Sequence, residues 1–413
     1  MPQTTESGNA DLHIELASPP GWTYTPGDNI IGTVLRRSPI IAPEATVKLA
    51  LVGRVKTKIT TNGSSSHSKY RARWYLFSTT TTQVLFRGPL HSFNENGLSW
   101  PFELGIPMRP AESALKDHYS EQGFLPLDKD GLAQHTLPGT FFSKNKAWRT
   151  SSEGFVEYYL EAWLQYRRGG LYEVHKSTYP ITLRPLSPVI FPGGSDIQHH
   201  KIEQKLRSQR LLPGMEHADL TLKQKTQKFL GSSKVPEVHY RIEIGWPRAV
   251  QLDNPSPIPF TLNVVPQQEM TSTSIKDIGL KVRLNWMSMI IKSTTTVLAP
   301  GDLRRLLTED DSHTVCHYLN LEKALERLEG PLEFSVEREN EPLDMGGLCQ
   351  LVLHPHGLSA GDRHLATVPT IQPDIITYNI RHSHLLELKL SLSVAGETYT
   401  VPMSTELMVL AAD

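Results

Sequence analysis

The sequence predicts an all-β protein made of two tandem immunoglobulin-like antiparallel β-sandwiches with short helical insertions. Apolar and polar residues alternate with a period of two through much of the chain, which is the pattern of half-buried strands. Turn-forming residues separate these segments at the spacing typical of sandwiches. The chain has 30 prolines in 413 residues, and frequent proline is more compatible with short strands than with long helices.

Five segments of the first half are expected to be strands. Pro26, Gly27 and Asp28 form a predicted structural turn before the second of them, because proline fixes φ and glycine allows a positive φ. The third segment is expected to end at Gly53, and Pro101 predicts an edge position for the fourth. In order, the five segments are residues 12–16, 29–35, 47–51, 98–104 and 156–164.

The second half has the same style without an exact sequence repeat. Its clearest strand segments are residues 238–244, 278–286 and 386–394. Gly396 is expected to form a hairpin turn after the last of these, with Tyr399 and Val401 on the returning strand. We therefore expect the two halves to share an architecture.

These segments group into two domains. Residues 1–10 are expected to be a flexible N-terminus, residues 11–190 the first sandwich and residues 236–413 the second. Proline and glycine break the strand pattern between them. Residues 191–235 are therefore predicted to be a basic, partly helical connector, with helical spacing over 198–212.

Two insertions depart from the strand pattern. Residues 109–139 are expected to form an irregular loop with a helical turn at 111–116. Residues 319–328 predict a short helix, because Leu321, Leu325 and Leu328 fall on one side of it. Both would be insertions in a β domain and would not change its fold class.

Positive charge is concentrated in the connector. Its basic residues outnumber the acidic residues Glu203, Glu216 and Asp219. Such a stretch suits contact with anionic lipid or a phosphorylated tail, while a solvated face is the simpler interpretation. The candidate partner-binding residues are Lys201, Lys205, Arg207, Arg210, Lys223, Lys225 and Lys228. Elsewhere, basic pairs at 36–37, 56/58, 69/71/73 and 167–168 are interpreted mostly as solvated faces.

Composition argues against several classes of protein. Lys plus Arg is 42 and Asp plus Glu is 43, which argues against nucleic-acid binding through bulk positive charge. Cys316 and Cys349 are too few for a disulfide framework or a four-cysteine zinc site. Residues 1–9 lack the apolar core of a secretory signal, and no apolar run approaches the roughly 20 residues that span a bilayer. We expect a soluble, cytoplasmic protein.

The common catalytic motifs are absent. The chain has no nucleotide-binding glycine loop, no nucleophile elbow and no H-E-x-x-H zinc motif. Two His-x-His pairs, at 354–356 and 382–384, lack a third metal ligand at a matching spacing. Cys316 and His317 are neighbours, which point to opposite faces of a strand. We expect no enzymatic activity, no metal and no cofactor; a hydrolase or metal enzyme on a β scaffold is an alternative.

Several segments resemble arrestin-like proteins, most closely the fungal alpha-arrestin type. Residues 24–34 read Tyr-Thr-Pro-Gly-Asp-Asn-Ile-Ile-Gly-Thr-Val and resemble a recurring Y-x-P-G-D-x-I-x-G-x-V signature of that family. The other matching segments occur in the family's order, and the resemblance covers about 11–190 and 236–410. They are residues 12–16, 47–53, 100–107 and 157–162 for the N-terminal domain, and 258–262, 378–386 and 394–396 for the C-terminal domain.

The resemblance implies a non-catalytic adaptor or scaffold. Members of the family bind cytosolic parts of membrane transporters or receptors and act in endocytosis, ubiquitin-linked trafficking or signalling. Many alpha-arrestins recruit a HECT-type ubiquitin ligase through Pro-Pro-x-Tyr motifs. The resemblance therefore also implies recruitment to the plasma membrane or endosomes, with peripheral membrane association and contact with a ubiquitin ligase or the endocytic machinery.

The sequence departs from the family at two points. Its only Pro-Pro, at 19–20, is followed by Gly-Trp, so ligase recruitment through Pro-Pro-x-Tyr is not expected. Visual and beta-arrestins sense receptor phosphates with paired lysines near the first strand, where this chain has Asp11, His13 and Glu15. A cargo-recognition subunit of a retromer-like sorting complex, which shares the arrestin fold, is an alternative function.

Overall fold

The structure is a computed structural model in which strands predominate. Side chains are not described at 62, 67, 225, 228, 300, 307–320 and 363–364. The described residues are 3–62, 67–77, 81–93, 97–111, 123–125, 135–146, 148, 150–168, 170–186, 196–216, 218–230, 234–300, 307–320, 325, 330–361, 363–364 and 370–412.

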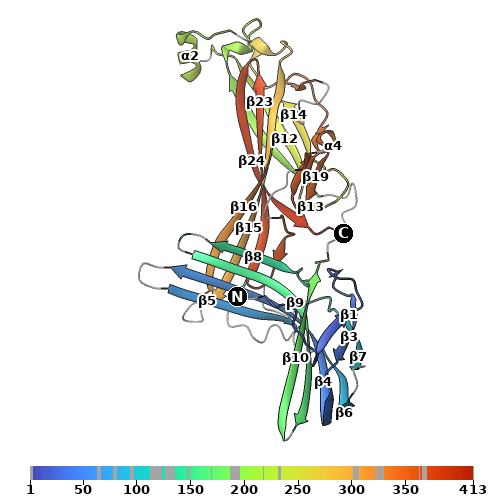
Figure 1. Cartoon of the computed structure of the whole chain (residues 1–413). Helices are drawn as coiled ribbons and strands as arrows, with labels where there is room; N and C mark the ends of the chain where they lie inside the picture. The colour runs from blue at the N-terminus through green and yellow to red at the C-terminus, as the bar shows by residue number, and fades with distance from the viewer. Residues whose placement is uncertain are drawn as a thin grey trace. The chain divides into compact units, whose positions relative to one another are not determined.

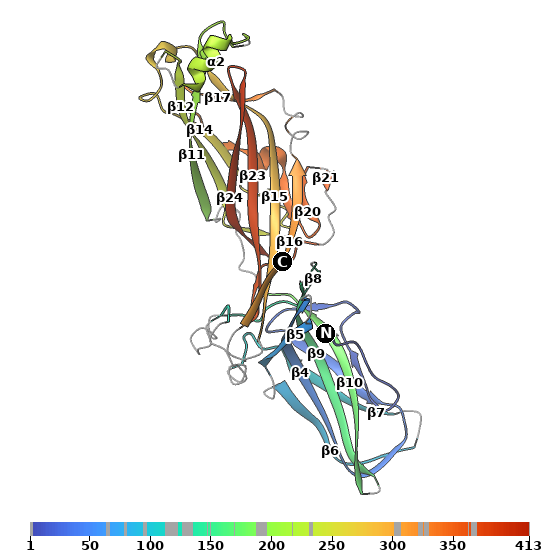
Figure 2. The same cartoon turned by 90° about the vertical axis from the view of Figure 1, so that its left-hand side faces the viewer.

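The chain forms two compact units. Unit 1 comprises residues 1–187, 294–314 and 375–382, and unit 2 comprises residues 188–293, 315–374 and 383–413. Each unit contains a smaller and a larger sheet whose strands are mainly antiparallel (Figures 1 and 2). The predicted all-β class, with two tandem sandwiches and few helices, is confirmed.

Unit 1 combines a three-stranded sheet with a seven-stranded sheet. The small sheet has the order β1-β3-β7, so Pro101 lies on an edge strand as predicted. The large sheet has the order β2-β10-β9-β4-β5, with β6 also paired to β4 and β8 to β9. The strands are β1 (His13–Leu16), β2 (Thr23–Tyr24), β3 (Asn29–Arg36), β4 (Ile40–Asn62), β5 (His67–Phe77), β6 (Thr82–Ser92), β7 (Leu98–Gly105), β8 (Phe141–Lys146), β9 (Thr150–Arg168) and β10 (Leu171–Leu183).

The strands β4 and β9 are long enough to have different neighbours at their two ends. β4 pairs with β6 over its first part and with β5 from Gly53 onward, while β9 pairs with β8 and then with β10. The prediction that the third strand ends at Gly53 is wrong. Gly53 lies at a register shift, and the rings of Phe77 and Tyr158 come within 2.7 and 2.8 Å of the place a Cβ would occupy.

The segment β5-β4-β9-β8 packs one of its faces on residues from the second half of the sequence. Val297 and Ile380 belong to the same core cluster as the side chains of β4 and β9. The rings of Trp74 and Tyr378 stack with their centroids 4.9 Å apart. Residues 294–314 and 375–382 were expected in the second sandwich, but their apolar side chains contribute to the core of unit 1, so they belong to that unit.

A buried polar contact fixes the same segments. The Thr57 hydroxyl donates a hydrogen bond to the Leu298 carbonyl at 2.5 Å, and it accepts one from the Asn379 side-chain amide at 3.0 Å. Thr57 and Asn379 are both buried. Because buried polar groups are costly without partners, these bonds specify how residues 298 and 379 lie against β4.

Unit 2 has the same two-sheet style, plus a third small sheet. The orders are β11-β12-β14-β18, β13-β24-β23-β15-β16 with β17 and β22 attached, and β19-β20-β21; β22 and parts of β15, β16 and β23 belong to unit 1. Ala395 and Gly396 have φ of 47° and 75° between β23 and β24, which confirms the hairpin. The strands are β11 (Ile197–Arg207), β12 (Glu237–Pro247), β13 (Ala249–Gln251), β14 (Thr261–Pro266), β15 (Lys281–Pro300), β16 (Leu307–Asn320), β17 (Leu332–Ser335), β18 (Leu343–Asp344), β19 (Leu351–His354), β20 (Gly357–Ala360), β21 (Arg363–His364), β22 (Ile375–Ile376), β23 (Ile380–Val394) and β24 (Glu397–Leu410).

The helices are short. The helix predicted over 198–212 is wrong, because residues 197–207 are the strand β11, which pairs with β12 along its length. The described helical elements are η3 (Gln209–Leu211), α2 (Leu222–Phe229), η4 (Thr273–Ile275) and α4 (Met345–Cys349). The helical turn predicted at 111–116 and the helix predicted at 319–328 lie mostly outside the described residues. In the described part of the chain, no helix has the length and apolar character needed to cross a bilayer.

Candidate basic interface

The second face of β5-β4-β9-β8, which points away from the core, is strongly basic. Side chains alternate between the two faces of a sheet, so the cations at every second position of β4, β5 and β8 share this face. Over the part of the sheet formed by residues 53–62, 67–77, 141–146 and 150–158, the described cations are Arg54, Lys56, Lys58, Lys69, Arg71, Arg73, Lys144 and Lys146, and the described carboxylates are Glu153 and Glu157, with Glu161 further along the same side of β9. We call this set the basic face.

Like charges stand directly opposite each other across two strands of the basic face. Lys56 of β4 pairs in register with Arg73 of β5, and Lys58 pairs with Arg71. Arg71 and Arg73 are exposed, while Lys56 is buried. Opposed like charges destabilise a sheet, and a bound anion would relieve that repulsion.

Glu157 of β9 is a buried counterion on the basic face. Its carboxylate accepts a hydrogen bond from Arg54 Nε at 2.5 Å and lies 3.1 Å from Lys56 Nζ. The Arg54 guanidinium also lies over the ring of Tyr159, 4.8 Å from its centroid, and Lys56 Nζ lies 5.3 Å from the centroid of Phe155. The aromatic rings and the carboxylate therefore hold the two cations in place.

The pKa shifts of Glu157 and Lys56 show that the negative charge of Glu157 is well stabilised, while the positive charge of Lys56 is not. Burial raises the pKa of Glu157, but the Thr4 amide, Arg54 and Lys56 outweigh burial and leave the pKa below its usual value. Burial lowers the pKa of Lys56, and Glu157 offsets this only in part while Arg54 and Arg73 add to the lowering. One carboxylate serves two cations, so the site keeps an excess of positive charge.

The N-terminal segment helps to form this cluster. The Thr4 backbone N–H donates to Glu157 Oε2 at 2.7 Å, and Arg54 Nη2 donates to the Thr4 hydroxyl at 2.8 Å. Ser7 and Thr178 of β10 exchange two backbone hydrogen bonds, each of 2.9 Å. Residues 1–10 were expected to be flexible, but residues 4–7 are tied to β9 and β10, partners that lie far along the sequence.

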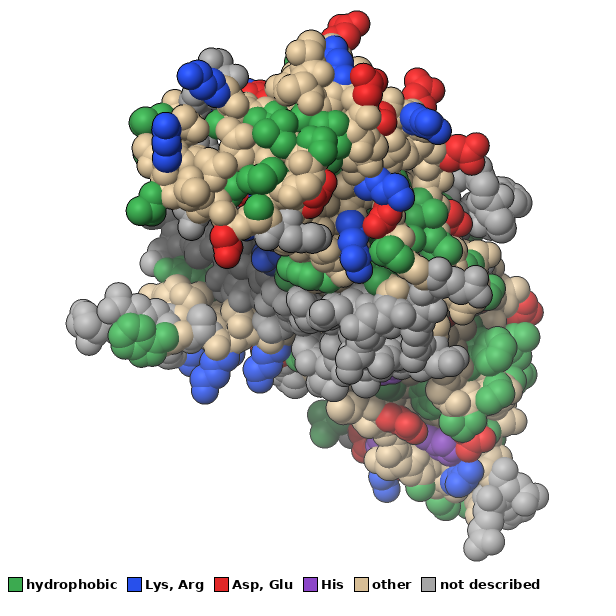
Figure 3. Space-filling view, turned by 90° about the horizontal axis from the view of Figure 1, so that it is seen from above, with side chains coloured by type: hydrophobic (Ala, Val, Ile, Leu, Met, Phe, Trp, Pro, Cys, Tyr) green, Lys and Arg blue, Asp and Glu red, His purple; other side chains and the backbone are tan. Residues whose placement is uncertain are grey.

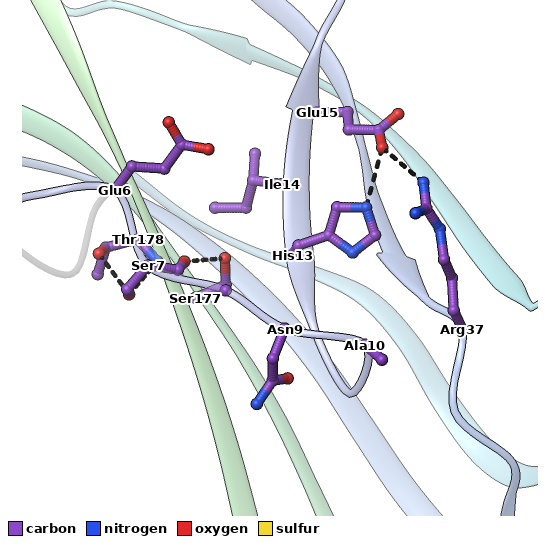
Figure 4. Close-up of a pocket in the computed structure, with 11 residues that line it drawn as sticks. Glu6, Ser7, Asn9, Ala10, His13, Ile14, Glu15, Arg37, Ser177 and Thr178 are labelled. Atoms are coloured by element: carbon purple, nitrogen blue, oxygen red, sulfur yellow. Dashed lines mark hydrogen bonds and ion pairs between the residues drawn. The ribbon is translucent and has the colours of Figure 1, made fainter.

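A shallow pocket lies where the N-terminal segment meets β1 and β10. Figure 4 shows Ser7 beside Ser177 and Thr178, with Glu6, Asn9 and Ile14 around them. On β1, Glu15 binds both His13, at 2.9 Å, and Arg37, at 3.1 Å. Glu15 of the first strand is thus paired with nearby basic side chains. On the basic face, by contrast, the described cations outnumber the described carboxylates.

The structure distributes the predicted connector residues over three elements of unit 2, the strand β11, the turn η3 and the helix α2. Lys205 and Arg207 of β11 both pair with Glu237 of β12, and Lys201 stands opposite Glu243. Burial raises the pKa of Glu237, but Lys205, Arg207 and His239 outweigh burial and lower it to about 2. These cations are therefore largely neutralised within the sheet.

The remaining connector cations lie outside β11, and those whose side chains are described do not pair with Glu237. Arg210 donates to the backbone carbonyls of Ala218, at 3.0 Å, and Gly396, at 3.3 Å. Lys223, Lys225 and Lys228 lie on α2. The connector thus divides into a charge-paired strand and a separate lysine-bearing helix, and the seven candidate residues do not form one site.

The predicted turn and the histidine pairs have structural partners. Gly27 has φ of 96°, and the Asp28 carboxylate accepts from the Thr25 backbone N–H at 2.7 Å. His354 binds Asp253 at 2.8 Å, and His384 binds Asp374 at 2.6 Å. Within the part of the chain that the structure describes, no three His, Cys, Asp or Glu side chains are arranged to hold a metal ion.

Comparison with known proteins adds no family. No family model matches the chain, and no curated protein sequence matches it significantly. The all-β architecture with paired sheets is compatible with an arrestin-like fold.

Proposed function

We propose that the protein is a non-catalytic, arrestin-like adaptor or scaffold of the alpha-arrestin type, whose basic face binds acidic or phosphorylated cytosolic segments of membrane proteins. The observation that supports this most is the pair of opposed like charges, Lys56 with Arg73 and Lys58 with Arg71. The repulsion between these cations destabilises the free protein. An anionic partner relieves the repulsion when it binds, and this relief favours binding.

The form of the site favours an extended peptide over a small molecule. The exposed cations Lys69, Arg71 and Arg73 lie at every second position along β5, and β5 and β8 flank β4 and β9. Figure 1 shows β4, β5, β8 and β9 running side by side. A chain of carboxylates or phosphates can contact several of these cations at once along the strands.

The wider role follows from the resemblance of the sequence to arrestins. Binding the cytosolic segments of transporters or receptors would make the protein an adaptor in endocytosis, ubiquitin-linked trafficking or signalling, in the cytoplasm and at the plasma membrane or endosomes. Because the chain has no Pro-x-Tyr sequence, a ubiquitin ligase would have to be recruited through another contact.

The proposal is tested by reversing charge on β5. In Arg71→Glu/Arg73→Glu, affinity for a fluorescent oligoglutamate peptide is expected to fall by about tenfold or more at low salt, because both positions face the bound acid. Fluorescence anisotropy of the full chain measures the dissociation constant. The matched control is Arg167→Glu/Arg168→Glu at the end of β9, which makes the same change in net charge away from the basic face.

Two results would contradict the proposal. The first is equal loss of affinity in both double variants, which would mean that the peptide responds only to net charge. The second is an affinity of the wild type for oligoglutamate no greater than for oligoglutamine. Circular dichroism spectra of both variants must match that of the wild type, so that a loss of binding is not a loss of folding.

A further inference from the structure

The helix α2 exposes its apolar side chains and half-buries its glutamines. Leu222, Phe229 and Leu230 are 84%, 90% and 73% exposed, while Gln224 and Gln227 are of intermediate burial. A helix on the surface of a globular domain normally has the reverse arrangement, with its apolar stripe against the core. Large exposed apolar side chains gathered on one element mark a contact surface.

The exposed residues form one continuous stripe. Positions 222, 226, 229 and 230 fall on the same side of a helix with 3.6 residues per turn. Thr226 lies between the apolar residues of this stripe, and its hydroxyl donates to the Leu222 carbonyl at 2.9 Å, so it does not interrupt the stripe with an unpaired polar group. The stripe is about 12 Å long, the length of an eight-residue helix.

Hydrogen bonds at its two ends hold the helix, and the stripe is exposed in the part of the chain that the structure describes. Thr221 and Gln224 make a capping box, in which the Thr221 N–H donates to Gln224 Oε1 at 2.8 Å and the Gln224 N–H donates to the Thr221 hydroxyl at 3.4 Å. At the other end, the Leu230 N–H donates to the Thr226 carbonyl at 2.9 Å. These bonds lie at the ends of the helix and leave its apolar side exposed.

The positive charge of α2 favours an anionic partner. The helix reads Leu-Lys-Gln-Lys-Thr-Gln-Lys-Phe, with three lysines and no acidic residue. Seen from above, hydrophobic side chains lie next to Lys or Arg side chains on the left of the visible face, where α2 lies, and the Asp and Glu side chains lie mainly to the right of them (Figure 3). Apolar residues combined with lysines on a short helix are typical of segments that lie in the interface of an anionic bilayer.

We infer that α2 is a membrane-contact helix, which inserts Leu222, Phe229 and Leu230 among the headgroups and upper acyl chains of an anionic lipid surface. Three apolar side chains give only weak, reversible binding, and the lysines reinforce it by attraction to the lipid headgroups, by about fivefold in affinity for each cation near the surface. The inference rests on unit 2 alone and does not depend on the function proposed for the basic face.

Vesicle sedimentation with the full chain tests the inference. We expect the wild type to sediment with vesicles of phosphatidylcholine mixed with phosphatidylserine, and to bind much less to phosphatidylcholine alone. Leu222→Ser/Phe229→Ser/Leu230→Ser is expected to lower the partition coefficient by about tenfold or more, because the inserted apolar area is lost. The control Leu171→Ser/Val174→Ser removes exposed apolar side chains from β10 and is expected to bind as the wild type does.

If something other than a membrane covers the stripe, the measurements will differ. If two copies of the chain cover it, light scattering will find a dimer of the wild type that the triple variant abolishes, and the lipid inference is overturned. It is also overturned if the wild type does not bind the mixed vesicles, or if the triple variant binds them as well as the wild type. Equal loss in the triple variant and the β10 control would show nonspecific adsorption and would count against α2.

Discussion

Glu157→Gln is expected to lower the free energy of unfolding of unit 1 by about 3 kcal/mol or more, because it leaves two cations buried without their counterion. The side chains of Arg54 and Lys56 are only 13% and 7% exposed, so water cannot replace the lost carboxylate. A glutamine amide still accepts a hydrogen bond but supplies no charge. Urea denaturation of the full chain, combined with hydrogen exchange at the amides of β4 and β9, measures the loss where it occurs.

Glu161→Gln is the matched control for this prediction. Glu161 lies four residues further along β9 on the same side of the strand, and it pairs with Lys176 at 3.5 Å. Lys176 is 59% exposed, so this is a surface ion pair, worth less than about 1 kcal/mol. If both variants lost the same free energy, the buried cluster would have no special importance for unit 1.

The effect of Glu157→Gln is also expected to depend on pH. The folded-state pKa of Glu157 is below its usual value of 4.5. Its ionisation therefore contributes stability above about pH 4.5, and that contribution is lost as the pH falls through the folded-state pKa. The stability difference between wild type and variant is thus expected to narrow in acid. Denaturation curves at neutral and acidic pH measure it, and a difference that grows in acid would contradict the assignment.

The pKa of Lys56 is also lowered in the folded protein, but for a lysine this means that the fold disfavours the charged form. Burial lowers its pKa in the folded protein, so the charged lysine destabilises the fold at neutral pH and the cost disappears only when the lysine loses its proton in base. Lys56 also stands opposite Arg73. Under the proposed function, an anionic partner bound over Arg73 would offset part of this cost.

The fold class was predictable because strand periodicity is local. Alternation along β3, β7, β12 and β23 is visible in the sequence, and those strands form where it predicts them. The same local signal is ambiguous at residues 198–212. Ile202 and Leu206 are four residues apart, a spacing that places two side chains on one face of a helix and also on one face of a strand, and pairing with β12 selects the strand.

The candidate site was less predictable because it depends on register. The cations at 56 and 58 and those at 69, 71 and 73 are visible in the sequence as separate basic pairs. Their spacing of two places each group on one face of its own strand, but only the pairing of β4 with β5 brings the two groups together. Glu157 is 103 residues from Arg54 along the chain, and nothing local marks it as a counterion of these cations. The exposed stripe of α2 is likewise a property of how the helix packs.

Gly154→Val is expected to destabilise unit 1 by about 3 kcal/mol, because the space beside this glycine is occupied by the second half of the chain. A Cβ at Gly154 would lie 2.8 Å from Val297 Cγ1 and 3.1 Å from Ile380 Cδ1. Both neighbours belong to the core of unit 1. The absence of a side chain on β9 is therefore what allows residues 294–300 and 375–382 to pack there.

A double-mutant cycle separates this cause from a general intolerance of valine in β9. Val297→Ala removes the methyl group nearest to the new side chain, so Gly154→Val/Val297→Ala is expected to be more stable than the sum of the single losses by about 1–2 kcal/mol. Val282→Ala provides the control, because Val282 lies on the same strand β15 but in the core of unit 2. That combination is expected to be additive within about 0.5 kcal/mol. Additivity in both cycles would mean that residue 297 does not meet β9, and the assignment of this segment to unit 1 would fall.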